Sequence, residues 1–309
     1  MKRVGLLFDD EQNSYQQLLA EEARSAARQH GIELLEPSFA RGSVVQQIGQ
    51  CYELMRADPA PDGVLLLLVA PDDMESSVER LAKRGVDCVF LNRVPAYLES
   101  LSQRFPERLL ASVAPEQTEI GRIQGRQCLR LLPEGGLVVL IRGASASPSA
   151  VSRELGFREV VGDQVSIHVI TGRWQEARAE KALDDWLRFR AGAGELDLVV
   201  SQNDAMARGA RRALRRHSPE GEATGLAAIP ILGCDGLPEE GQEMLRQGEL
   251  SATVAMPPTS SRAIEILAAW WSQGEVLREA TLLPSSLPPV GQLEPLRRAP
   301  RAYHATRRS

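Results

Sequence analysis

Short apolar runs alternate with longer amphipathic stretches along this chain. The runs are rich in valine, isoleucine and leucine, and each is long enough for one β-strand. We expect strands at residues 4–8, 33–36, 63–69, 88–91, 109–113, 137–142, 166–171, 196–201, 230–233 and 252–255. Helical patterns fill most of the intervals, and strands that alternate with helices form repeated βα units. The pattern therefore predicts an α/β fold with parallel sheets.

The series of βα units starts twice. Residues 15–30 carry leucines and alanines on one helical face, and Gly31 follows at the usual position of a helix C-cap. After the strand at 109–113, a helix over about 116–132 and a turn at 133–136 lead into a new series of strands. We therefore expect two Rossmann-like lobes, although the two halves show no repeat in their residues.

The restart sets the expected boundaries of the lobes. Residues 1–112 with 257–280 form the N-terminal lobe, and residues 113–255 with 281–292 form the C-terminal lobe. The backbone then crosses between the lobes three times and makes a three-strand hinge. Prolines and arginines dominate the end of the chain, so we expect residues 293–309 to form a flexible tail, with a docking segment as the alternative.

Composition is that of a globular chain with two domains. The 309 residues are 43% hydrophobic and 25% charged, and the net charge of −5 does not favour nucleic acid or a membrane surface as a partner. A repressor would carry a helix-turn-helix domain ahead of the first strand, and we expect no direct DNA binding. The longest apolar run, 64–70, is far shorter than the roughly 20 residues of a membrane-spanning helix. No signal peptide is evident, so we expect a cytoplasmic location, or a periplasmic one if a leader has been removed.

Sequence signals for an enzyme are missing. No G-x-G-x-x-G follows the first strand, no G-x-x-x-x-G-K-[ST] occurs, and no Ser-His-Asp order is evident. The four cysteines lie far apart, which indicates buried thiols rather than a zinc site or a disulfide framework. Asp9 and Asp10 resemble the acidic pair of receiver domains, but Asn92 and Arg93 stand where that fold has a lysine. We expect no catalytic residue, metal or cofactor.

Polar side chains gather directly after the predicted strands. The carboxyl ends of parallel strands meet at one edge of a sheet, and ligands bind there in open α/β folds. Asn13, Tyr15 and Gln16 follow the first strand, and an amide and a guanidinium follow the fourth. The second half has a similar set: Ser145, Ser147, Ser149, Ser152, Arg153, Arg173, Trp174, Gln202, Asn203, Asp204 and Asp235. Such planar groups and rings suit a polyhydroxylated ligand, because they hold neighbouring hydroxyls and cover apolar C–H faces.

Two segments carry the most specific motifs of the chain. Residues 203–210 read N-D-A-M-A-R-G-A, and residues 231–236 read I-L-G-C-D-G. They resemble the N-D-x-M-A-x-G-A and V-G-F-D-G segments of the type I periplasmic binding proteins and of the effector-binding cores of lactose-repressor-type regulators. Weaker similarities lie at N-S-Y (13–15), E-I-G-R (119–122), R-E-L-G-F (153–157) and G-E-L-S-A-T-V-A (248–255), and the resemblance covers roughly residues 3–292.

The resemblance implies which side chains face a ligand: Asn13, Tyr15, Asn92, Arg93, Arg153, Trp174, Asn203 and Asp235. It implies that Tyr15 and Trp174 stack on the ligand from opposite lobes. Gln16 and Met256 occupy two further ligand positions, where the family often has a second aromatic residue and a polar residue. These departures favour a ligand that is less like a simple pyranose.

Each candidate also has a structural interpretation. Tyr15 could fasten its helix to the sheet, and Trp174 could belong to the core. The two arginines could form ion pairs or lie in solvent, as arginines usually do. Asp204 could cap the helix that follows it, and Asp235 could be a turn residue.

Together these expectations describe a small-molecule binding protein rather than an enzyme. The resemblance implies the solute-binding component of an ABC-type transporter, which holds a sugar or sugar-like ligand between its lobes while the hinge closes. Its partner would be the transporter permease. The alternative is a cytoplasmic ligand sensor that acts on a regulatory partner protein and has no DNA-binding domain of its own. Two arginines allow an anionic ligand as readily as a neutral sugar.

Overall fold

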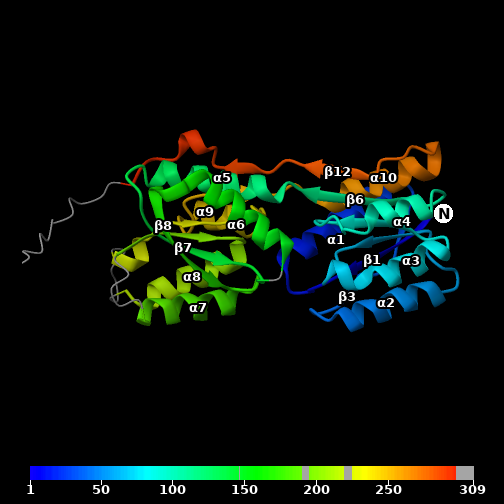
Figure 1. Ribbon diagram of the computed structural model, residues 1–309, viewed down its shortest axis with the longest axis horizontal. Helices are drawn as coiled ribbons and strands as arrows, with labels where there is room; N and C mark the ends of the chain where they lie inside the picture. The colour runs from blue at the N-terminus through cyan, green and yellow to red at the C-terminus, as the bar shows by residue number, and fades with distance from the viewer. Residues whose placement is uncertain (146, 190–194, 219–224, 297–309) are drawn as a thin grey trace, which may run out of the picture.

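The computed structural model describes residues 1–145, 147–189, 195–218 and 225–296. Two lobes lie side by side along the longest axis of the molecule (Figure 1). Each lobe contains a parallel β-sheet with buried cores on both of its faces. The predicted α/β class with two lobes is confirmed.

The sheet of the first lobe has seven parallel strands. They are β1 Arg3–Phe8, β2 Glu33–Leu34, β3 Ser38–Phe39, β4 Gly63–Leu66, β5 Asp87–Leu91, β6 Leu110–Pro115 and β12 Glu279–Leu282. The order is β12-β6-β5-β4-β1-β2, and β3 also pairs with β1. A strand from the end of the chain, β12, thus completes the N-terminal lobe by pairing with β6.

Helices cover both faces of this sheet: α1 Ser14–Gln29, α2 Val44–Arg56, α3 Glu75–Lys83, α4 Leu98–Arg104 and α10 Thr259–Gln273, with a 3-10 helix, η1 Pro71–Met74, ahead of α3. Successive side chains of a strand point to opposite faces. Leu6 and Phe8 therefore join the core under α1 and α10, while Leu7 and Leu66 join the core under α2, α3 and α4. Because both faces are buried, the strands read as continuous apolar runs.

The second lobe repeats this arrangement with a four-stranded sheet. Its strands are β7 Gly136–Arg142, β8 Val165–Thr171, β9 Leu196–Ser201 and β10 Ile231–Leu232, in the order β10-β9-β7-β8. A separate antiparallel pair joins β11 Thr253–Ala255 to β13 Ser285–Leu287. The helices are α5 Gln117–Leu131, α6 Pro148–Val161, α7 Glu176–Phe189, α8 Asp204–Arg216 and α9 Gly241–Arg246, with 3-10 turns η2 Gly162–Gln164, η3 Gly225–Ala228 and η4 Val290–Gln292.

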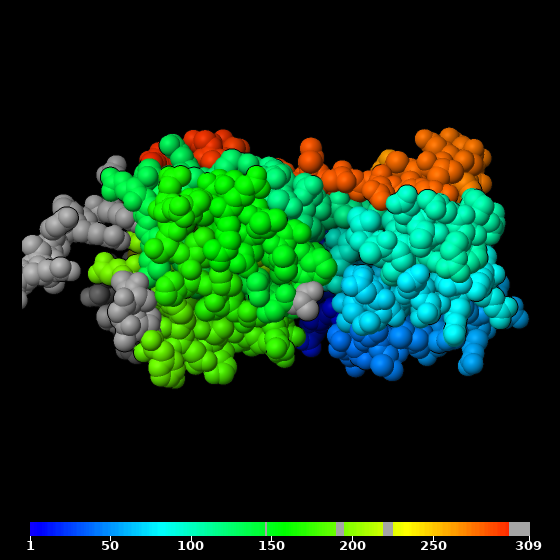
Figure 2. Space-filling model, viewed as in Figure 1, coloured from blue at the N-terminus to red at the C-terminus, as the bar shows by residue number. Residues whose placement is uncertain are grey.

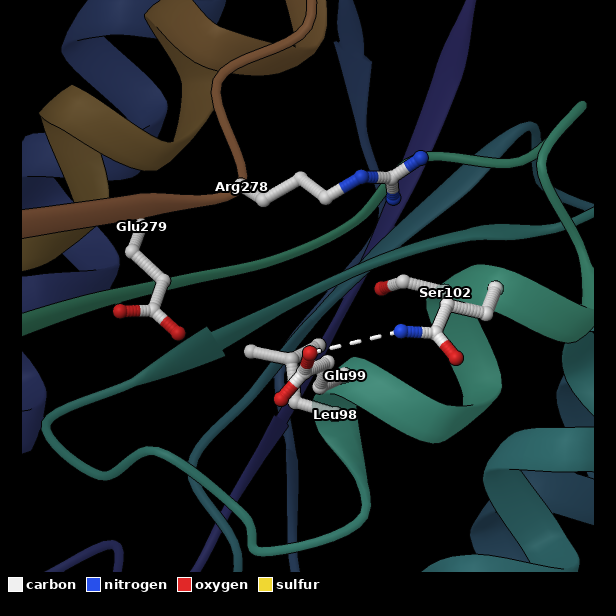
Figure 3. A pocket seen from close by; sticks show the side chains of 6 residues that line it. Leu98, Glu99, Ser102, Arg278 and Glu279 are labelled. Carbon is white, nitrogen blue, oxygen red and sulfur yellow. Dashed lines mark hydrogen bonds between the residues drawn. The ribbon is translucent and has the colours of Figure 1, made fainter.

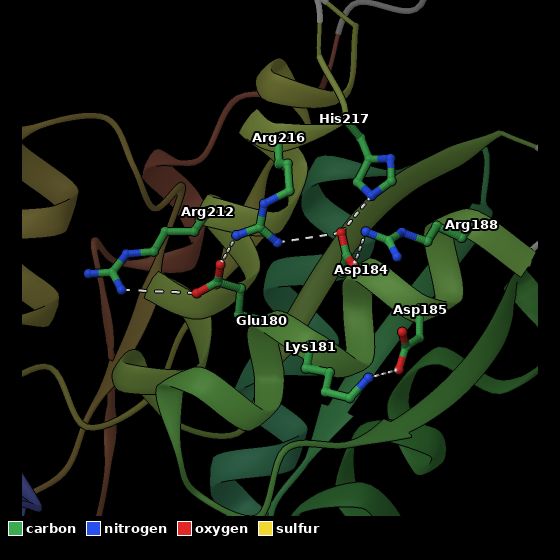
Figure 4. Close-up of polar contacts among 8 residues, drawn as sticks. All are labelled: Glu180, Lys181, Asp184, Asp185, Arg188, Arg212, Arg216 and His217. Atoms are coloured by element: carbon green, nitrogen blue, oxygen red, sulfur yellow. Dashed lines mark hydrogen bonds and ion pairs between the residues drawn. The ribbon is translucent and has the colours of Figure 1, made fainter.

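Ion pairs join the outer faces of α7 and α8 (Figure 4). Glu180 contacts Arg216 and lies 4.0 Å from Arg212. Asp184 lies 2.8 Å from His217 and 3.0 Å from Arg188. The three arginines of these pairs are exposed, so each arginine pair makes a small contribution to stability. The network explains the polar face of the arginine-rich helix α8, whose other face packs in the core.

The predicted strands are present, and three more were missed. These are the short β3 and the strands β12 and β13. The last two lie in a proline-rich segment with little apolar character. Strands β6 and β12 pair as far as Pro115 and Leu282. Residues 113–115 and 281–282 therefore belong to the first sheet, whereas the sequence pattern had placed them in the second lobe.

The expected tail begins later than residue 293. The side chain of Leu293 is 5% exposed and belongs to a core of the second lobe. The backbone amide of Leu296 donates to the Leu131 carbonyl at 3.0 Å. The apolar side chains of Leu293 and Leu296 therefore hold this segment against α5, contrary to the prediction, and residues 297–309 lie outside the described residues.

Helices α5 and α6 cross with their backbones in direct contact, because two glycines lie at the crossing. A Cβ atom added at Gly121 would lie 1.9 Å from the carbonyl oxygen of Arg153, and one added at Gly156 would lie 2.0 Å from that of Thr118. These are the glycines of the E-I-G-R and R-E-L-G-F motifs. Their physical role is to bring α6 close enough to α5 to fix the position of Arg153.

We expect the Gly121→Ala substitution to lower the free energy of unfolding by roughly 1–3 kcal/mol, the usual cost of extra atoms in a packed site. Gly49→Ala in α2 is the matched control, because no atom lies within 4 Å of its added Cβ and alanine favours a helix. That variant should be as stable as the wild type or more stable. Urea unfolding of both variants makes the comparison, and a wild-type stability of Gly121→Ala would contradict the proposed close packing.

Candidate ligand-binding cleft

A cleft of about 1350 Å³ opens between the two lobes. Figure 2 shows the groove that separates the lobes on one face of the molecule. Every predicted ligand residue lines this cleft: Asn13, Tyr15, Gln16, Asn92 and Arg93 from the first lobe, and Arg153, Trp174, Asn203, Asp235 and Met256 from the second lobe and its hinge. Reading the positions after strands thus selected residues that the fold brings together.

Unusual backbone conformations concentrate in this cleft. Within the described ranges, the non-glycine residues with positive φ are Arg41, Asn92, Arg173, Trp174 and Asp235, and all of them line it. Such conformations cost free energy and persist where the surrounding structure imposes them, often at binding sites. After β8, the left-handed pair Arg173 and Trp174 turns the indole onto Gly143, where an added Cβ would lie 2.1 Å from the ring.

Tyr15 belongs to the core of the first lobe and also orients Asn92. Its side chain is 5% exposed, and its hydroxyl donates to Oδ1 of Asn92 at 3.2 Å. The hydroxyl of Thr259 donates to the same oxygen at 2.9 Å. Burial raises the pKa of Tyr15 above its usual range. The oxygen of Asn92 is therefore held by two hydroxyls, and its amide nitrogen remains for other contacts.

Asn13 and Gln16 shape the loop that follows β1. Asn13 caps α1, because its Oδ1 accepts from the backbone amide of Gln16 at 3.1 Å. The Oε1 of Gln16 accepts from the backbone amides of Asp9 at 2.8 Å and Asp10 at 3.1 Å. Both side chains therefore have a structural role in addition to their place in the cleft.

Arg93 holds the end of the neighbouring strand. Its Nη1 donates to the carbonyls of Leu68 at 2.7 Å and Val69 at 3.2 Å. Burial lowers the pKa of Arg93, and the carboxylate of Asp9 acts in the opposite direction. Burial in turn raises the pKa of Asp9, although the backbone amide of Gly42 donates to it at 2.7 Å and Arg93 favours its charged form. The two charges share one wall of the cleft.

Arg153 is the most constrained side chain of the cleft. It is 5% exposed, and its Nε donates to Oε1 of Gln117 at 2.8 Å. Its Nη1 donates to the Gln202 carbonyl and to Sγ of Cys234, and its Nη2 lies 3.1 Å from Sδ of Met256. The guanidinium carbon lies 5.4 Å from the centre of the Trp174 ring, within range of a cation–π interaction.

Asn203 and Asp204 turn out to hold the start of α8. Asn203 caps this helix, since its Oδ1 accepts from the Met206 amide at 2.9 Å, while its Nδ2 donates to the Trp174 carbonyl at 3.2 Å. Asp204 does not line the cleft: it is fully buried and accepts from the amide of Gly236 at 2.7 Å and the hydroxyl of Thr253 at 2.8 Å. Asp204 is thus neither a ligand residue nor the helix cap that we considered, because Asn203 caps α8 and Asp204 binds the turn at Gly236 and strand β11 instead.

Asp235 presents a carboxylate to the cleft from a turn with φ of 113°. It is 7% exposed, and no described residue donates a hydrogen bond to its side chain. Burial and the nearby Asp204 raise the pKa of Asp235, while Arg153 acts to lower it. The carboxyl group of Asp235 therefore faces the cleft with hydrogen-bonding capacity that the described residues leave for a ligand.

Sequence reasoning missed Gln117 and Thr259, which organise the cleft, and named Ser147 among the residues after a strand without assigning it to the site. Gln117 joins the lobes, since it accepts from Arg153 and its Nε2 lies 3.5 Å from the carbonyl of Asn92. Thr259 orients Asn92, and the hydroxyl of Ser147 lines the cleft while buried without a partner among the described residues. Gln117 follows β6 directly, so the rule of reading residues after strands could have found it.

A second, smaller hollow of about 410 Å³ lies beside α4 (Figure 3). Leu98, Glu99 and Arg278 are among the residues that line it, and Glu99 accepts from Gln103 at 3.3 Å. No predicted ligand residue reaches it. Across the described ranges, no group of three or more histidine, cysteine, aspartate or glutamate side chains is placed to hold a metal ion. The four cysteines are free and buried, as predicted.

The two lobes, the chain crossings between them and the polar cleft define a two-lobed α/β protein with a ligand-sized site at its hinge. The chain belongs to the periplasmic binding protein domain family, whose sequence pattern matches residues 4–272. The resemblance that the motifs indicated is confirmed. No helix in the described ranges has both the length and the apolar character needed to span a membrane.

Two curated relatives are similar over most of the chain. A putative rhizopine-binding protein of Rhizobium meliloti is 28% identical over 262 residues, which cover 82% of this chain and 79% of the relative. The D-galactose/methyl-galactoside binding periplasmic protein of Haemophilus influenzae is 26% identical over 299 residues, covering 90% and 84%. Both relatives are binding proteins by name.

Solved structures share the fold. An ABC transporter periplasmic solute binding protein from Actinobacillus succinogenes with bound D-allose has a TM-score of 0.80 and 18% identity, and covers 93% of this chain and 97% of its own. A Caulobacter myo-inositol binding protein has a TM-score of 0.77 and 20% identity, covering 92% of each chain. At these identities the likeness describes the fold alone.

The buried carboxylate of Asp204 predicts a pH dependence of stability. Burial raises its pKa from the ordinary 3.8 to about 7, and the nearby Glu240 adds to this rise. Between these values the folded protein keeps a proton that the unfolded chain has lost. The free energy of unfolding should therefore fall as the pH rises from about 4 to about 7.

Urea unfolding of the wild type and Asp204→Asn across pH 5–8 isolates this contribution, since other titrating groups largely cancel in the difference. The stability advantage of the wild type over the variant should shrink as the pH rises and level off above about pH 7. A difference that does not change with pH would contradict a raised pKa of Asp204.

Proposed function

We propose that this protein binds a small polyhydroxylated molecule between its lobes and serves as the solute-binding component of an ABC-type transporter. The observation that carries the proposal is the convergence of amides, two arginines, a carboxylate and an indole on one interlobe cleft. Such a set holds neighbouring hydroxyls by paired hydrogen bonds and covers a ring face. The sugar and polyol ligands in the names of relatives and fold neighbours support this ligand class.

The size of the cleft supports closure on the ligand. Its volume of about 1350 Å³ exceeds the range of about 300–1,000 Å³ typical of small-molecule sites. A monosaccharide could therefore touch both walls only after the lobes approach each other. Because the ligand gains contacts to both lobes only in that state, its binding favours closure.

The hinge of this proposal consists of three chain crossings. We place them where strands of one sheet give way to elements of the other lobe: at 115–117, at 255–259 and at 282–285. Residues 1–115, 259–273 and 279–282 would then move as one lobe. Residues 117–255 and 285–296 would form the other, so that Asn92 and Arg93 approach Trp174 and Asp235 on closure.

We propose that the permease of the transporter is the partner and that binding occurs in the periplasm. The support is the periplasmic designation of the family and of the galactoside-binding relative. The site calls for binding and release rather than chemistry. Its most buried polar groups, Arg153 and Asn203, are held by protein contacts and present no activated nucleophile.

The Arg153→Ala substitution should weaken ligand binding at least tenfold, because it removes the group that fixes Trp174 and Gln117 around the site. Arg158→Ala on the same helix is the matched control, since Arg158 is exposed and contacts Glu154 at 2.9 Å. A thermal-shift screen of sugars, sugar acids, polyols, nucleosides and amino acids identifies the ligand, and calorimetry compares the variants.

Circular dichroism and melting of Arg153→Ala establish that it is folded before its affinity is compared. Equal affinity of a folded Arg153→Ala and Arg158→Ala would refute the assigned site. A wild-type protein that is folded but binds no member of the panel would count against the proposed function itself.

A further inference from the structure

The hydrogen-bond polarity of the first lobe's wall is set by its backbone partners. A backbone N–H can only donate, so the side-chain atom that receives it must be the amide oxygen. Asn13 receives the amide of Gln16 in this way, and Gln16 receives the amides of Asp9 and Asp10. The amide oxygens of Asn13 and Gln16 are thus directed into the protein. Their NH2 groups donate to no acceptor in the described part of the chain.

Asn92 and Arg93 extend the same polarity. The hydroxyls of Tyr15 and Thr259 occupy the oxygen of Asn92, which leaves its NH2 group for the cleft. Arg93 uses only Nη1 for backbone carbonyls, and no described carboxylate lies within 4.0 Å of its guanidinium in an ion pair. The charge of Asp9 acts on the pKa of Arg93, but the carboxylate of Asp9 accepts a hydrogen bond from the backbone amide of Gly42. Four donor groups therefore line this wall. Its other carboxylates are engaged or exposed: Asp10 accepts from the amide of Gln12, Glu11 pairs with Arg41, and Asp72 and Asp73 are exposed.

A wall of donors discriminates between acceptor groups. A sugar hydroxyl can accept hydrogen bonds from such a wall. Its own proton then faces donors and finds no acceptor there, so in the closed cleft the hydroxyl loses the hydrogen bond that it donated to water. A carboxylate carries no proton and has about four lone-pair sites, so it satisfies several donors at once. A guanidinium beside it adds a charge-assisted, planar contact.

The opposite wall offers hydrogen-bond acceptors as well, beside the donors of Arg173 and Arg178. Asp235 offers a carboxylate that is 7% exposed and receives no hydrogen bond from a described side chain. The hydroxyl of Ser147 belongs to the same lining, on a residue that is 6% exposed, and has no partner among the described residues. Both can pair with ligand hydroxyls. The cleft therefore favours a molecule with a proton-free acceptor at one end and hydroxyl donors at the other.

We infer that the ligand is a sugar acid, whose carboxylate lies against Asn92 and Arg93 and whose hydroxyls face Asp235. The inference rests on the proposed function and narrows its ligand class. A carboxylate suits the site better than a phosphate, because it brings a single charge and because Arg41, the other described arginine of this wall, is already paired with Glu11.

Matched ligand pairs test the inference by calorimetry. The wild type is titrated with galacturonate, galactose and the methyl ester of galacturonate, with the corresponding glucose series including gluconate, and with galactose 6-phosphate. At least one acid should bind ten times more tightly than its neutral parent and its ester. Asn92→Asp should weaken binding of the acid at least tenfold and so remove that preference. The substitution replaces the NH2 group with a second acceptor oxygen, while the hydroxyls of Tyr15 and Thr259 keep the oxygen to which they donate.

Gln46→Glu is the control for charge alone, since Gln46 is exposed on α2, does not line the cleft and adds the same negative charge to the same lobe. Its affinity for the acid should stay within twofold of the wild type. Neutral sugars that bind as tightly as the acids, with no effect of Asn92→Asp, would overturn the sugar-acid inference and leave the proposed function intact. Tighter binding of the phosphate would overturn it too. A folded protein that binds none of these probes would overturn both.

Discussion

The buried guanidinium of Arg153 ties together more segments than any other side chain of the cleft. It joins α6 to the start of α5 through Gln117, to the end of β9 through the Gln202 carbonyl, and to Cys234 and Met256 near the hinge. A buried charge needs such partners, because an unpaired one costs several kcal/mol. The close α5–α6 crossing and the stacked indole of Trp174 complete its surroundings.

This constraint gives the two walls of the cleft different properties. In the second lobe, Arg153 and Asn203 form their hydrogen bonds with other protein groups and so shape the site. Asp235 remains to accept hydrogen bonds from a ligand. In the first lobe, Asn13, Gln16 and Asn92 turn their oxygens inward and leave donors facing the cleft. The same contacts that stabilise each lobe therefore decide which groups a ligand meets.

The sequence predicted the strands and the membership of the cleft well, for a physical reason. Strands buried on both faces are continuous apolar runs, and the carboxyl ends of parallel strands meet at one edge, so reading the residues after each run selects one region. The strands β12 and β13 were not predicted, because these edge and hinge strands have no buried face and therefore no apolar pattern in the sequence.

Individual roles were harder to predict than location. Nothing local to Asn203 reveals that both ends of its amide are used by α8 and Trp174, and the contacts of Gln117 depend on residues far away in sequence. Ser147 could not be singled out from the other serines after β7, because an unpartnered hydroxyl is recognised only once its neighbours are known. Pattern analysis finds where side chains meet, whereas their hydrogen bonds depend on the packed structure.

Closure of the lobes on a ligand is the central claim, and electron–electron distance measurements test it most directly. Spin labels at Lys83→Cys and Lys181→Cys report the separation of the lobes, since both positions are exposed on helices outside the cleft and the native cysteines are buried. A ligand that stabilises the protein should shift the distance distribution to a shorter, narrower one. An unchanged distribution with the ligand bound at saturation would contradict the account.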